Sequence, residues 1–185
     1  TCSCMRVQTS GLSGHPPRTV SRPVDLGDGE PHEASFRTVT ARRDAFPAGR
    51  LYFCEHLTPE LLWRKEWLTH PGRITGLAEL VVVTPEPGAA ARQLGALLEI
   101  EPQETGNETA RLGFASGFRL VFLAPDAYLA RFGRSARMRQ DRETYFGALG
   151  LKCESAAGIE KRAKGLDCVS VSKDGGTLAV SLGEL

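Results

Sequence analysis

The sequence predicts an α+β protein built around a curved mixed sheet. The main observation is that the order strand, helix, strand, strand occurs at 77–124 and again at 145–182. A second observation is the continuous apolar run at 77–84, which is typical of a central strand. Two such units packed as one curved sheet would bury the apolar faces of both. The repeat is one of architecture, with little residue identity behind it.

Turn and cap residues set the limits of the elements in this double unit. Pro85 and Pro87 open a helix, because proline suits the first helical position, and Ser116-Gly117 closes a hairpin. Asp126 stands at or near the cap of a short helix. The predicted elements are strands at 77–84, 109–115, 118–124, 145–153, 166–172 and 177–182, helices ending at 98 and spanning 126–132 and 155–164, and a hairpin turn at 173–176.

The part before the double unit predicts a tail, three extended segments and a helix. Residues 1–17 lack periodicity and are expected to form a flexible tail. Thr58-Pro59 predicts a helix start, with Thr58 as the N-cap, so that Trp63 and Trp67 would share one helix face. The extended segments are 18–26, which Pro23 places at an edge or bulge, 34–41 and 51–55.

Composition points away from nucleic acid and membranes as partners. Among 185 residues, 23 Lys and Arg balance 22 Asp and Glu, which leaves a net charge of +1. No apolar run approaches the ~20 residues that cross a bilayer. The five cysteines are odd in number and lack metal-site spacing, and three of them lie in apolar segments, as reduced cysteines do. We therefore predict a cytoplasmic protein.

The stretch from 50 to 80 carries a distinctive string of residues. A strand ends in Glu55-His56, Thr58-Pro59-Glu60 follows, both tryptophans come next, and His70-Pro71-Gly72 ends the predicted helix. This string resembles the linker of the glyoxalase-like domain family of the vicinal-oxygen-chelate superfamily. The resemblance implies paired βαβββ modules that close into a cupped sheet. It divides the chain into a tail at 1–17, partial strands of a preceding, incomplete module at 18–57, a linker helix at 58–71, and a glyoxalase-like domain at 72–185 with modules at about 72–125 and 143–185.

The resemblance also implies a divalent metal in the cup, held by His, Glu or Gln from the outer strands of both modules. Glu79 lies near the start of the first strand of module one, and Glu184 follows the last strand of module two. The resemblance implies metal ligands at these two positions. The ligand set is poor, because 118–124 and 145–151 contain no His, Glu or Gln. The alternative is that Glu79 and Glu184 are carboxylates at strand ends that pair with arginine or face water.

His56, Trp63 and Trp67 are candidate ligand-binding residues. The tryptophans could wall a small-molecule pocket or anchor the linker helix on a sheet. His56 could take part in binding or acid–base work, or could hydrogen-bond the Thr58-Pro59 turn. A basic cluster begins in the short helix and continues beyond it, and it predicts a solvated loop, with an anion or RNA role as the alternative. Its members are Arg131, Arg134, Arg137, Arg139 and Arg142.

The function predicted from these observations is binding of a small molecule in the cup of the sheet. If the protein is an enzyme, the resemblance implies lyase, isomerase or dioxygenase-type chemistry next to a carbonyl. The alternatives are a non-catalytic protein that sequesters a ligand, as drug-binding members of the superfamily do, and a degenerate module kept for assembly. Because an incomplete module leaves a sheet edge unpaired, we expect a homodimer.

Overall fold

The computed structural model describes residues 11–69, 71–164, 169–174 and 177–182. The chain divides into two compact units, Thr1–Thr69 with Leu97–Glu99, and His70–Ala96 with Ile100–Leu185. In the described part of the chain, none of the helices combines the length and the apolar character that crossing a bilayer requires.

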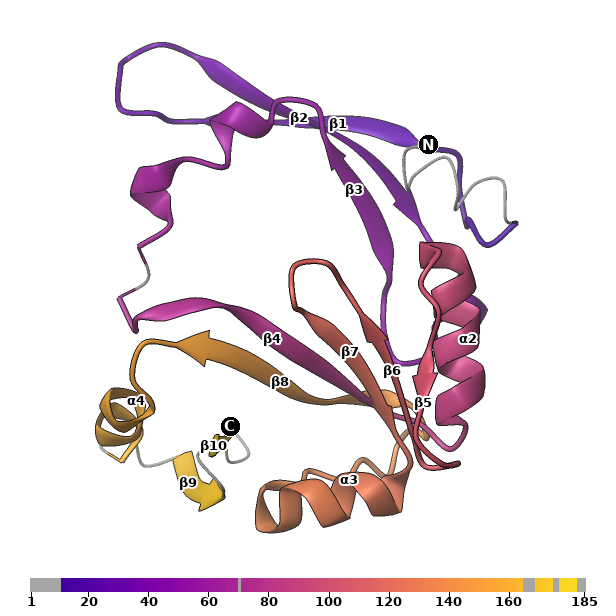
Figure 1. The fold of residues 1–185 in the computed structure, drawn as a ribbon. Coiled ribbons are helices and arrows are strands. Elements are labelled where there is room, and N and C mark those ends of the chain that lie inside the picture. Colours follow the sequence, from indigo (N-terminus) through magenta and orange to yellow (C-terminus); the bar gives the residue numbers. More distant parts are fainter. Residues whose placement is uncertain (1–10, 70, 165–168, 175–176, 183–185) are drawn as a thin grey trace. The chain divides into compact units, whose positions relative to one another are not determined.

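The first unit is built on a three-stranded antiparallel sheet with strand order β1-β2-β3 (Figure 1). Its elements are β1 (Arg18–Val24), β2 (His32–Thr40), the 3-10 turn η1 (Arg43–Ala45) and β3 (Tyr52–His56). The predicted flexible tail at 1–17 is wrong for residues 11–14. Ser13 forms a β-bridge with Ala41, and Gly14 N donates to Thr40 O at 2.9 Å, because backbone groups at the end of β2 need partners. Residues 1–10 of that prediction lie outside the described residues.

The predicted linker helix at 58–71 is also wrong. The chain instead makes two 3-10 turns, η2 (Pro59–Leu61) and η3 (Lys65–Trp67), separated by extended backbone at Arg64. The physical reason is a competing contact, because the Trp63 ring stacks on His56 of β3. A short helix is marginal by itself, so this contact outweighs helix propensity. Trp63 and Trp67 therefore do not share a helix face.

The second unit contains a five-stranded mixed sheet with strand order β5-β6-β7-β4-β8. Strand β4 runs parallel to β7, and the other neighbours are antiparallel. A strand, a helix and three strands therefore fold so that the last strand lies beside the first, which is βαβββ order, and the predicted α+β class is confirmed. The elements are β4 (Ile74–Val83), α2 (Pro87–Leu98), β5 (Gln103–Glu104), β6 (Thr109–Gly113), β7 (Arg119–Leu123), α3 (Pro125–Phe132), the 3-10 turn η4 (Gly133–Ser135) and β8 (Tyr145–Cys153).

Helices α2 and α3 cover opposite faces of this sheet (Figure 1). Gly95 of α2 approaches so closely that a Cβ there would lie 3.1 Å from Leu112 Cδ2. Helix α3 covers the other face, where it packs Tyr128 into the core. That core consists of Val81, Val83, Val121, Leu123, Tyr128 and Tyr145. Neighbouring residues of a strand point to opposite faces, so one sheet supplies both apolar layers.

Tyr128 attaches α3 to β8. Its hydroxyl donates to Gly147 O at 2.9 Å and accepts from Arg137 N at 3.1 Å. Residue 147 has to be glycine here, because a Cβ would lie 2.8 Å from Val83 Cγ2 and 2.9 Å from the Tyr128 ring. The buried hydroxyl is thus satisfied while its ring fills the core.

The order strand, helix, strand, strand recurs after α3. It comprises β8, α4 (Ala156–Ala163), β9 (Val169–Asp174) and β10 (Thr177–Leu182), and β9 pairs with β10 in antiparallel fashion. The Ser155 hydroxyl caps α4 by accepting from Gly158 N at 3.2 Å. Two residues of the predicted turn at 173–176, residues 175 and 176, lie outside the described residues.

Tyr145 offers a pH test of this core. Burial raises the pKa of Tyr145 above its usual value, so its neutral form is favoured in the folded state. Above about pH 10 the unfolded state loses this proton first, and the stability of the wild type falls as pH rises. We expect Tyr145→Phe to gain stability relative to wild type between about pH 8 and pH 11, measured by urea unfolding. Tyr52→Phe, at an exposed tyrosine, is the control. An unchanged difference at the two pH values would contradict the assignment.

Candidate functional site

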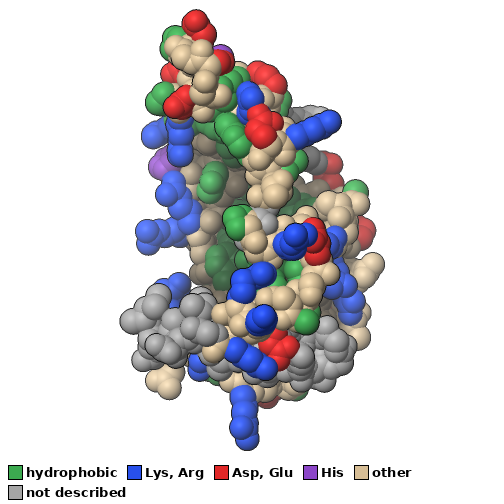
Figure 2. Space-filling model, turned by 90° about the vertical axis from the view of Figure 1, so that its left-hand side faces the viewer, with side chains coloured by type: hydrophobic (Ala, Val, Ile, Leu, Met, Phe, Trp, Pro, Cys, Tyr) green, Lys and Arg blue, Asp and Glu red, His purple; other side chains and the backbone are tan. Residues whose placement is uncertain are grey.

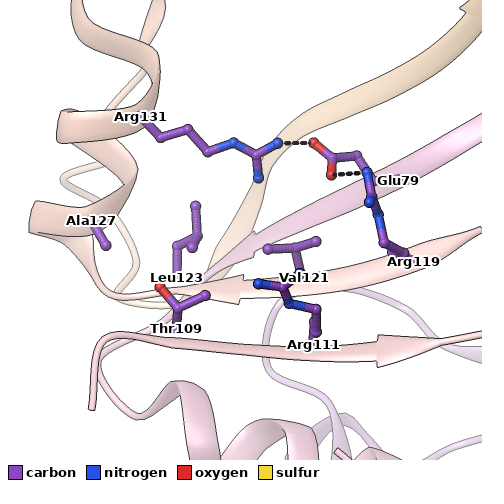
Figure 3. Close-up of a pocket in the computed structure, with 8 residues that line it drawn as sticks. All are labelled: Glu79, Thr109, Arg111, Arg119, Val121, Leu123, Ala127 and Arg131. Carbon is purple, nitrogen blue, oxygen red and sulfur yellow. Dashed lines mark hydrogen bonds and ion pairs between the residues drawn. The ribbon is translucent and has the colours of Figure 1, made fainter. Parts of the chain in front are cut away.

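A cavity of about 320 Å³ lies on the α3 face of the five-stranded sheet, within the second unit. Its walls come from β4, β6, β7 and α3 (Figure 3). The lining residues are Glu79, Thr109, Arg111, Arg119, Val121, Leu123, Ala127 and Arg131. The cavity therefore combines an apolar wall with four charged side chains.

Strand register brings these side chains together. Arg119, Val121 and Leu123 alternate along β7 and so point to the same face. Arg111 of β6 lies opposite Val121, and Glu79 of β4 lies opposite Arg119. Helix α3 adds Ala127 and Arg131, which are four residues apart and therefore share a helix face.

Glu79 is the buried charge of this site, with 8% of its surface exposed. Arg131 donates to its Oε1, and Arg119 Nη2 lies 3.4 Å from its Oε2. Gly150 of β8 makes room for the side chain, since a Cβ at that position would lie 2.6 Å from Glu79 Cγ. Both carboxylate oxygens therefore have guanidinium partners, one from the sheet and one from α3.

Positive charge exceeds negative charge in the cavity. Among the described residues that line it, three arginines face one glutamate, so two positive charges remain after Glu79 is counted. Within the described part of the chain, the Arg111 side chain has neither an ion-pair nor a hydrogen-bond partner, although the residue is half-buried. A half-buried guanidinium beside Val121 and Leu123 is suited to an anionic ligand, because an opposite charge offsets its lost hydration.

The described residues do not fit the divalent metal that the resemblance implies. Both oxygens of Glu79 are held by arginines, and two adjacent cations oppose a third. The cavity lining offers no second carboxylate, imidazole or thiolate, and no cluster of three such groups occurs among the described residues. Glu184 lies outside the described residues. Of the two interpretations of Glu79, pairing with arginine matches the geometry. The joint Glu79 and Glu184 metal site stays a prediction.

The structure brings together only two of the three predicted ligand-binding residues, His56 and Trp63. His56 and Trp63 stack with ring centroids 5.5 Å apart, and Phe36 meets the His56 edge at 5.2 Å. Trp67 instead lies under the Arg64 guanidinium, at 5.5 Å. The Thr58 hydroxyl accepts from Ser35 N at 2.9 Å, whereas His56 Nδ1 is buried and has no partner among the described residues. Ligand binding by His56, Trp63 and Trp67 stays a prediction.

Sequence reasoning missed the arginines of the cavity. Arg131 was counted in a solvated basic cluster, although it falls within the helix predicted at 126–132, and it reaches Glu79 from α3. Arg139 and Arg142 do form exposed pairs with Asp141, and Arg139 holds the pKa of Asp141 far below its usual range. Figure 2 shows Lys and Arg side chains over one face of the molecule, with Asp and Glu among them. The missed signals were Arg119, which alternates with Val121 and Leu123 along β7, and Arg111, which lies opposite Val121 in β6.

Comparison with known proteins leaves the family open. No protein-family model matches the chain, and no curated protein sequence matches it. Among solved structures, the chain is similar to a crystal structure of methylmalonyl-CoA epimerase from Mycobacterium tuberculosis, with a TM-score of 0.43 and 12% sequence identity. That match covers 66% of this chain and 96% of the other. A likeness of this size shows nothing about activity.

Gly150→Ala tests whether the close packing holds Glu79 in place. The new Cβ would meet Glu79 Cγ, so we expect a loss of about 1–3 kcal/mol in the free energy of unfolding. Adding Glu79→Ala should remove part of that loss, and a double-mutant cycle measures the coupling. Gly76→Ala is the matched control on β4, because a Cβ there meets nothing within 4 Å. Purely additive effects would show that the two residues do not depend on each other.

Proposed function

We propose that this chain is a glyoxalase-like protein that binds a small organic anion in the arginine-lined cavity. The observation that carries the proposal is Arg111, a half-buried guanidinium without a partner among the described residues, beside an apolar wall. Ligand pockets commonly combine a mostly apolar lining with a few polar groups that fix orientation. Here the polar groups are cationic, so the ligand is an anion with an apolar portion.

The binding mode follows from the donors that remain available. A guanidinium carries five N–H donors in a planar fork, which suits the oxygen pair of a carboxylate or phosphate. Arg111 can give two donors to one such group. Arg119 and Arg131 keep further N–H groups after their contacts with Glu79, and the Thr109 hydroxyl can add another donor. The hydrocarbon part of the ligand would pack against Val121 and Leu123.

Glu79 acts in this proposal as a positioning residue. By accepting from both Arg119 and Arg131, it fixes two long side chains that would otherwise lose freedom on binding. Such preorganisation lowers the entropic cost of recognition. Holding the arginines also occupies the only carboxylate among the described residues that line the cavity. Binding without turnover is therefore favoured over proton-transfer catalysis, which needs a base free to accept a proton.

The proposal is tested with succinate as the probe, in an NMR titration of the whole chain at low ionic strength. We expect shifts at the backbone amides of cavity residues and at the Arg111 Nε–H, and no response to succinamide, the neutral analogue. Arg111→Gln should weaken succinate binding about tenfold or more, because a charged hydrogen bond contributes about 1.5–3 kcal/mol.

The matched control is Arg92→Gln, which removes the same charge from an exposed residue of α2 that pairs with Glu104. This variant should bind succinate as the wild type does. Equal weakening in both variants would mean that only net charge matters, and equal response to succinamide would mean that the cavity does not recognise anions. Either result would overturn the proposal.

A further inference from the structure

We infer that the ligand of this cavity is a small dianion, a dicarboxylate or a phosphate group on a short carbon skeleton. This inference rests on the proposed function and goes further by fixing the ligand's charge. The charge of the lining is its starting point, because Glu79 cancels only one of the three guanidinium charges. A monoanion would leave one cation uncompensated beside the apolar wall, whereas a dianion neutralises the site.

The arrangement of the cations supports two negative charges on the ligand. Arg119 lies opposite Gly113, and Arg111 comes two residues before Gly113 on β6. The two arginines are therefore diagonal neighbours on one sheet face. Diagonal neighbours are about 7–8 Å apart at the backbone. Arg131 approaches from α3 on the other side of the cavity (Figure 3). An anion between them is contacted from two directions.

The apolar wall limits the rest of the ligand. Val121, Leu123 and Ala127 line the same cavity as the arginines, and the cavity measures about 320 Å³, the low end of the range for small-molecule sites. A few carbon atoms can cover this wall. The charge, the spacing and the wall together describe either a short diacid or a small phosphate monoester, and these share the chemistry of two negative charges on oxygen.

The test compares four probes against the full chain by isothermal titration calorimetry at pH 7.5 and fixed low ionic strength. The probes are succinate, butyrate, inorganic phosphate and sulfate. Succinate and butyrate have four carbons each and differ in one carboxylate. The ratio of their dissociation constants therefore isolates the effect of the second charge. We expect the better of succinate and phosphate to bind at least tenfold more tightly than butyrate. Preference for succinate indicates a dicarboxylate, and preference for phosphate indicates a phosphate group.

A pH series confirms the charge in the phosphate case. Inorganic phosphate loses its second proton near neutral pH, so its affinity should fall between pH 7.5 and 5 as it becomes a monoanion. Sulfate keeps both charges over this range and should not weaken. Parallel behaviour of phosphate and sulfate would count against recognition of the second charge.

A variant separates this inference from the proposed function. Arg111→Gln lowers the excess charge of the lining from two to one, so the dianion-to-butyrate preference should shrink to about threefold or less. Arg92→Gln should keep the wild-type preference. If butyrate binds as tightly as both dianions, the dianion inference is wrong while anion binding stands. If none of the four probes binds, the proposed function fails as well.

Discussion

The buried carboxylate of Glu79 is the constraint on which the site depends. It lies on β4 between two neighbouring strands, and a charge in such a place is costly unless it is paired and hydrogen-bonded. Three features of the chain accommodate this buried charge. Arg119 comes from the parallel strand, Arg131 comes from α3, and Gly150 leaves the volume that the side chain fills. The pair with Arg131, together with the Tyr128 hydroxyl, holds α3 over the sheet and thereby shapes the cavity.

The charged cavity contributes less to the free energy of folding than a packed apolar core in its place would. Partly exposed ion pairs contribute about 0–1 kcal/mol, and replacing such clusters with packed apolar residues is often neutral or favourable. Three arginines around one glutamate also repel one another. An anion that binds only the folded state would remove this repulsion and stabilise the chain in proportion to its concentration. Local destabilisation that a ligand relieves is typical of a functional site.

The sequence predicted the helices and strands more accurately than the residues of the site. The strand at 145–153 has the predicted bounds, and the helix predicted at 155–164 is α4 at Ala156–Ala163, because apolar and helical patterns are local properties. The linker helix failed because Trp63 stacks on His56, a partner that helix propensity does not include. Glu79 was chosen by its position, and pairing with arginine was one alternative for it, but the particular arginines were not identified. Arg119 and Arg131 follow it by 40 and 52 residues, and only strand register and the docking of α3 bring them close.

The arginines also change the chemistry expected at this position. In the superfamily that the sequence resembles, a metal in the cup binds adjacent oxygens of the substrate and polarises them. A guanidinium can likewise hold an oxygen pair, through two parallel N–H donors. It has no open coordination position, however, and it cannot generate a hydroxide from bound water as a metal does. In the proposed function, Arg119 and Arg131 recognise an oxygen pair beside Glu79, and neither guanidinium supplies Lewis-acid activation or a free base. A site of this composition is better suited to holding an anion than to transforming one.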